Sequence, residues 1–99
     1  MGTYIILNRT KSNENTLYVK VGCSKHCYKR FEEVKRSTKF SGSNDELELL
    51  QIMPVNQYKK LERHIHIILA KFRCVGEWFA LSEDKLNSKL FMLNLADYK

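Results

Sequence analysis

The chain has 99 residues, of which 43% are hydrophobic and 11% aromatic, which is enough for one domain with a modest core and too little for two. Four glycines, one proline and interleaved charges exclude a disordered or low-complexity chain. Seventeen Lys and Arg against eleven Asp and Glu give a formal net charge of +6, which favours a polyanionic partner. No apolar run approaches the roughly 20 residues that cross a bilayer, so we expect a soluble intracellular protein, in the cytoplasm or nucleus, with no membrane partner.

The first two predicted elements are strands. Residues 3–8 and 17–22 are rich in β-branched and aromatic side chains, and a polar stretch separates them, so they predict a hairpin. In the second strand the valines alternate with Tyr18 and Lys20, which places these two polar side chains on the face opposite to the valines. That polar face is a candidate wall of a functional site.

A helix is predicted over residues 25–36, with Ser24 as its N-cap. Its buried stripe consists of three side chains at helical spacing, Cys27, Phe31 and Val34. Arg30 lies just beside that stripe, where it can reach a ligand. Four basic side chains occupy the remaining surface, namely Lys25, Lys29, Lys35 and Arg36. They fit either a solvated helix face or a nucleic-acid-binding surface that faces phosphates.

A glycine- and serine-rich loop precedes residues 46–53, which we predict to be a third strand ended by Pro54. Its apolar residues do not alternate cleanly and would also suit a helix. The short length of the run and the proline favour the strand.

The next helix has Asn56 as a candidate cap and a continuous apolar stripe formed by Leu61, Ile65, Ile68 and Phe72. Glu62 and His66 are one turn apart on one flank of this stripe, so both can point toward a shared ligand. Such pairs also occur simply as stabilisers of a helix surface.

Residues 76–79 form a compact aromatic segment, in which Trp78 and Phe79 are predicted core residues. Ser82 can cap a final helix that carries Leu86, Leu90 and Leu93. The expected fold is therefore α+β, a single domain over residues 1–99 with a small three-stranded, mainly antiparallel sheet flanked by helices. The expected element order is β-β-α-β-α, then the short segment and a last α.

Several of these residues fall in one ordered set of short motifs, Gly2-Thr3-Tyr4, Lys20-Val21-Gly22, Arg30, Glu62 with His66, and Gly76-Glu77-Trp78-Phe79. In this order and spacing the chain resembles the GIY-YIG nuclease superfamily, in particular its compact viral and phage-type branch. The resemblance covers residues 2–81. The main departure is Lys20, which stands where the family usually has a tyrosine, with Tyr18 displaced by one step along the same face.

The resemblance implies an endonuclease that hydrolyses DNA phosphodiester bonds, with duplex DNA as partner and one Mg²⁺ or Mn²⁺ as cofactor. Glu62 offers a hard oxygen ligand for the metal, and the forked donors of Arg30 suit the phosphoryl transition state. Tyr4, with Lys20 lowering its pKa or binding phosphate, would activate water on a wall shared with Tyr18. His66 would relay a proton or orient a water. Target choice would come from a protein partner or an oligomer.

Two alternatives remain open. The substituted second motif would suit a nucleic-acid-binding module of this fold that has lost cleavage. A protein-interaction domain, in which Tyr4, Glu62 and His66 only satisfy one another, is the second. A zinc site built from Cys23, Cys27, His64 and His66 is disfavoured, because C-x3-C with H-x-H matches no standard ligand spacing. The three cysteines fit a reducing compartment with free thiols.

Overall fold

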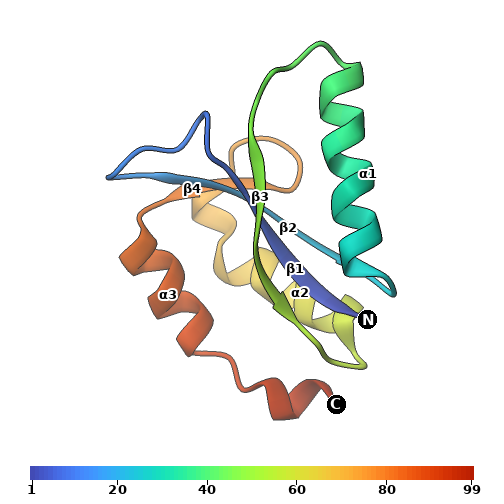
Figure 1. The fold of residues 1–99 in the computed structure, drawn as a ribbon. Helices are drawn as coiled ribbons and strands as arrows, with labels where there is room; N and C mark the ends of the chain where they lie inside the picture. The colour runs from blue at the N-terminus through green and yellow to red at the C-terminus, as the bar shows by residue number, and fades with distance from the viewer.

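The computed structural model describes all residues, 1–99, as one sheet with helices on both of its faces (Figure 1). The strands are β1 (Gly2–Asn8), β2 (Leu17–Ser24), β3 (Leu47–Met53) and β4 (Trp78–Leu81), and the α-helices are α1 (Cys27–Phe40), α2 (Tyr58–Ile68) and α3 (Glu83–Phe91). Two short 3-10 helices, Ala70–Phe72 and Leu95–Tyr98, follow α2 and α3. None of the helices is both long and apolar enough to span a membrane.

The sheet has four strands in the order β3-β1-β2-β4, and every neighbouring pair is antiparallel. The predicted hairpin is confirmed as β1 and β2, and the predicted third strand as β3. The prediction of three strands is wrong, because residues 78–81 of the aromatic segment pair with residues 17–20 of β2. Only four residues long, β4 depends on this distant partner and not on its own sequence pattern.

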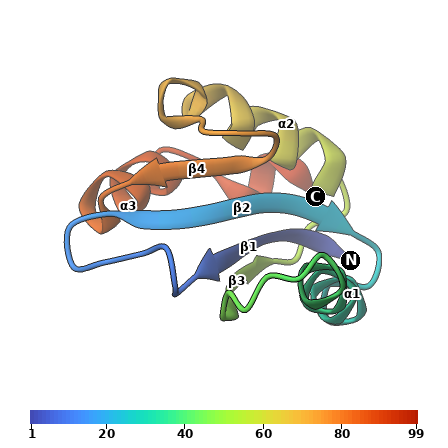
Figure 2. The same ribbon diagram turned by 90° about the horizontal axis from the view of Figure 1, so that it is seen from above.

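Helices α2 and α3 cover one face of the sheet and α1 covers the other (Figure 2). Each face carries a separate core. Thirteen buried side chains, including Val19 and Val21 of β2, lie on the face covered by α2 and α3. Four buried side chains, Tyr4, Ile6, Cys27 and Phe31, form the smaller core beneath α1. The alternation of β2 therefore places its valines in the larger core, as predicted, and turns Tyr18 and Lys20 toward the α1 face.

The first helix differs from its predicted bounds at both ends. It begins at Cys27, and its N-cap is His26, which makes no side-chain capping bond. The predicted cap Ser24 lies before the helix, where its hydroxyl accepts from the backbone N–H of His26. It continues past Arg36 to Phe40, where Thr38 donates its hydroxyl to the Val34 carbonyl one turn back.

The second helix also departs from prediction at its ends. Its N-cap is Gln57 and not Asn56, and the α-helix stops at Ile68, so that Phe72 lies in the following 3-10 turn. The predicted cap of the last helix is confirmed, because the Ser82 hydroxyl accepts from the backbone N–H of Lys85.

Candidate active site at the open edge of β2

The candidate site lies where β4 stops short of the end of β2. β4 pairs only with residues 17–20, and the Val21 amide donates to the carbonyl of Glu77, the residue before β4. The Val21 carbonyl, which points to the same edge, accepts from His66 Nε2 of α2 at 3.0 Å. The Val21 carbonyl would pair with the next residue of β4 if that strand were longer, and the His66 side chain replaces this partner. Side chains of α2 thereby lie at the open edge of β2.

Tyr4 is the buried centre of this site, with 2% of its surface exposed. Its ring lies across Gly22, the residue paired with it on β2. Only glycine leaves room for the ring, because a Cβ at that position would overlap the outer atoms of the phenol. Burial raises the pKa of Tyr4 above its ordinary value of 10.0, and the contact with Arg30 and its positive charge only partly offset that effect. The same contact raises the pKa of Arg30. Tyr4 is therefore a neutral phenol held beside a guanidinium.

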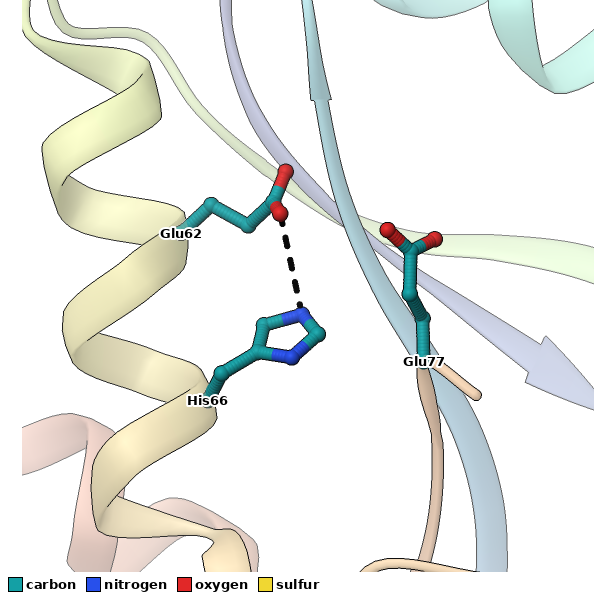
Figure 3. A group of neighbouring side chains, drawn as sticks. All are labelled: Glu62, His66 and Glu77. Atoms are coloured by element: carbon teal, nitrogen blue, oxygen red, sulfur yellow. Dashed lines mark ion pairs between the residues drawn. The ribbon is translucent and has the colours of Figure 1, made fainter. Parts of the chain in front are cut away.

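Two carboxylates and an imidazole face one another in a small cluster (Figure 3). The charges of both carboxylates act on Tyr4. Glu62 and His66 project from α2, and Glu77 projects toward them from the segment before β4. One ligand atom from each lies within 4.8 Å of the other two. Carboxylate oxygens are the donors that Mg²⁺ and Mn²⁺ prefer, so the donor set fits a hard divalent cation.

The hydrogen bond of His66 limits its part in metal binding. Its Nε2 lies 3.0 Å from the Val21 carbonyl and 3.8 Å from Glu62 Oε1. A nitrogen that donates to a carbonyl carries a hydrogen and has no lone pair for a cation. The carboxylates of Glu62 and Glu77 are thus the oxygen donors of this cluster, whereas His66 Nε2 is engaged with the backbone of β2.

Lys20 lies on the other side of Glu77. Its Nζ is 3.1 Å from Glu77 Oε2 and 5.8 Å from the centre of the Trp78 ring, and its side chain is 18% exposed. The expectation that Lys20 lowers the pKa of Tyr4 is wrong, because that pKa is raised and the cation acting on Tyr4 is Arg30. Lys20 instead neutralises the second carboxylate of the site.

Arg30 and Lys20 open together onto a shallow hollow of about 320 Å³ between α1 and β4. Trp78 also lines it, and Tyr18 stacks on the far side of Trp78, with ring centres 5.0 Å apart and planes 9° apart. Trp78 was predicted to be core but is only half-buried, whereas Phe79 is fully buried as expected. The half-buried indole thus lies at the rim of the site, in contact with Tyr18 and beneath the Lys20 ammonium group.

Cys23 borders the acidic side of the site. Burial, together with a hydrogen bond to Glu62 and the charge of that carboxylate, raises the pKa of its thiol to about 12. The four residues of the zinc alternative do not come together, since Cys27 lies in the α1 core and His64 Nδ1 is 2.6 Å from the Tyr98 hydroxyl. Cys23, Cys27 and Cys74 are free thiols, as predicted.

The four basic residues predicted to bind nucleic acid lie around α1 but not all on one face. Lys35 pairs with Glu32 at 3.3 Å, while Lys25, Lys29 and Arg36 are exposed. At about 100° per residue, Arg36 lies on the solvent side of α1 and Arg30 on the flank next to Lys20.

Glu77 was not among the predicted site residues, although it belongs to the Gly76-Glu77-Trp78-Phe79 motif. It lies outside every predicted helix and strand, so periodicity could not identify it. The usable signal was the preceding glycine: Gly76 has φ +58, a conformation that favours glycine, and it marks the turn that aims Glu77 inward.

The fold and the site together define a small α+β domain with a cation, a phenol and two carboxylates gathered at one sheet edge. Its sequence matches the model of the T5orf172 domain over residues 1–92. The chain therefore belongs to the T5orf172 domain family. No curated protein and no solved structure matches it.

Proposed function

We propose that this protein is a divalent-metal-dependent endonuclease of the GIY-YIG type that hydrolyses DNA phosphodiester bonds. The observation that carries the proposal is the convergence of Tyr4 from β1, Arg30 from α1 and Glu62 from α2 on one point, where both charged groups act on the Tyr4 hydroxyl. The T5orf172 membership and the net charge of +6 support the choice of DNA as substrate.

Glu62 and Glu77 would hold the metal, Mg²⁺ or Mn²⁺, since their oxygens lie close together and His66 is engaged with a backbone carbonyl. When bound, such an ion stabilises charge on phosphoryl oxygens and lowers the pKa of a bound water. His66 lies one turn from Glu62 on α2, with its Nε2 3.8 Å from Glu62 Oε1, and it would orient a water molecule beside that carboxylate.

Arg30 would bind the scissile phosphate on the side opposite to the metal ligands Glu62 and Glu77. Its guanidinium is permanently charged, and its planar donors match two phosphoryl oxygens at once. Lys20 lies on the same hollow and would exchange its contact with Glu77 for a phosphate when DNA binds. Arg30 and Lys20 would then stabilise the negative charge that builds on the phosphoryl oxygens as the phosphorus becomes five-coordinate.

Tyr4 enters this reaction as a phenol, because its raised pKa keeps it protonated at neutral pH. We assign its oxygen to accept a hydrogen bond from the attacking water, with Arg30 fixing the position of the phenol oxygen. The proton that the water loses would pass to solvent, and the departing 3′ oxygen would take a proton from solvent. Tyr18 would support Trp78 by stacking and take no proton.

One observation favours a second candidate, a DNA-binding module of the same fold that does not cleave. The ion pair between Lys20 and Glu77 at 3.1 Å neutralises one of the two carboxylates, which would weaken a metal site. The two candidates differ in whether DNA stays intact when metal is present.

Incubation of the protein with supercoiled plasmid in Mg²⁺, Mn²⁺ or EDTA tests the proposal. The wild type is expected to nick or linearise the plasmid only with metal, and Glu62→Gln to reduce the rate at least about 100-fold, as loss of one charge-stabilising group does. Glu83→Gln, at an exposed acid on α3, is the matched control and should cleave normally. Equal cleavage by wild type and Glu62→Gln would refute the metal assignment, and binding without cleavage would select the second candidate.

A further inference from the structure

A second recessed surface lies on the other flank of α1, facing the edge strand β3. It is a hollow of about 650 Å³ whose lining includes Met1, Lys25, Tyr28, Lys29, Ile52 and Pro54. In Figure 2 the N-terminus and β3 both lie beside α1, consistent with this lining. A second hollow adjoins it, since Tyr28 and Ile52 line both.

The side chains of this hollow combine an aromatic face with unpaired positive charge. Tyr28 is 74% exposed although it is a large aromatic residue. Neither Lys25 nor Lys29 forms an ion pair, in contrast to Lys35 and Arg30 on the same helix. Exposed aromatic rings flanked by free cations are the arrangement with which proteins hold unpaired bases, because the ring stacks on the base and the cations bind the backbone.

We propose that this hollow binds an unpaired nucleotide, with its base stacked on Tyr28 and its phosphate bound by Lys25 and Lys29. The volume is within the range of about 300 to 1,000 Å³ usual for small-ligand sites, so one nucleotide fits. The inference rests on the proposed function only in taking nucleic acid as the ligand.

The position of Tyr28 relates this hollow to the candidate active site. Tyr28 and Arg30 are two residues apart on α1 and so lie about 200° apart around its axis, on opposite flanks. A strand bound by Arg30 reaches Tyr28 by crossing the helix, whose width with side chains is about 10 Å. The protein would therefore prefer DNA with a flap, gap or single-stranded region next to the duplex that it cleaves.

Binding of a labelled single-stranded oligonucleotide and of the matching duplex, measured by fluorescence anisotropy in the Glu62→Gln background, tests this inference. Tyr28→Ala is expected to weaken single-strand binding about 5- to 150-fold, the range for loss of one stacked base, and to leave duplex binding unchanged. Tyr28→Phe should retain binding, because the ring remains. Phe40→Ala, at another exposed aromatic residue of α1, is the matched control and should have no effect.

A 2-aminopurine in the oligonucleotide gives an independent readout, since its fluorescence falls when it stacks on an aromatic ring. Quenching by wild type and Tyr28→Phe but not by Tyr28→Ala would support the proposal. Equal single-strand affinity of Tyr28→Ala and its parent, or tighter binding of a poly-glutamate peptide than of the oligonucleotide, would overturn it. Because these readouts need no cleavage, an inactive wild type that still binds through Tyr28 would refute the nuclease proposal alone.

Discussion

The two faces of the sheet differ in how many side chains they bury. The face under α2 and α3 holds thirteen buried side chains in a continuous core, whereas the face under α1 holds only four. The smaller core contains Tyr4, and its helix supplies Arg30, so the chemistry lies on the lightly packed side. The core under α2 and α3 therefore contributes most of the free energy of unfolding. The site forms at the sheet edge, where the two faces meet.

The largest expected effect on stability comes from truncating the larger core. Leu61→Ala removes a side chain with no exposed surface and should lower the free energy of unfolding by about 2–5 kcal/mol. Leu49→Ala makes the same change in a half-buried residue packed against the α1 core, and should cost about 1 kcal/mol. Urea unfolding followed by circular dichroism measures both, and equal losses would contradict the division between the faces.

A smaller effect is expected at the contact between Tyr4 and Gly22. Gly22→Ala inserts a methyl group into the space of the phenol and should destabilise the fold by about 1–3 kcal/mol. Tyr4→Leu removes the ring atoms that the methyl group meets. The double variant should therefore lose less than the sum of the two single variants, and strict additivity in denaturant melts would show that the two side chains do not compete for space.

The smallest expected effect is a difference in alkylation rate between two thiols of the wild-type protein. Cys74 is exposed, whereas the pKa of Cys23 is raised to about 12 from an ordinary 9.0. The neutral thiol is thus favoured in the folded site, so Cys23 forms little of the reactive thiolate at pH 9. Iodoacetamide labelling read by mass spectrometry should modify Cys74 first, and alkylation of Cys23 at the same rate would mean that the site edge is open to solvent.

Much of this fold could be predicted from periodicity. The hairpin, the third strand and the stripes of the helices follow from local patterns, and Ser82 was identified as a cap by its residue type alone. The fourth strand could not be found, because its four residues become a strand only by pairing with β2. The extension of α1 through Thr38 was missed because polar residues break the apolar pattern after Arg36, although the Thr38 hydroxyl bonds to the Val34 carbonyl one turn back.

Local spacing could place some residues of the candidate site but could not predict its contacts between distant segments. Arg30 and Glu62 could be placed beside their core stripes by helical spacing, and both act on Tyr4. The pairing of Lys20 with Glu77 could not be predicted, because it joins a strand to a turn 57 residues later. Nor could the hydrogen bond from His66 to Val21, which exists only because β4 ends early.

Two arginines of α1 distinguish a catalytic position from a merely basic one, because Arg30 borders the candidate site and Arg36 does not. Single-turnover plasmid cleavage with saturating protein and Mn²⁺ compares Arg30→Ala with Arg36→Ala, which removes an equal charge from the solvent side. We predict that Arg30→Ala slows cleavage about 100- to 1,000-fold and that Arg36→Ala slows it less than about threefold. Equal rates for the two variants would contradict the account, because charge alone and not position in the site would then explain the role of Arg30.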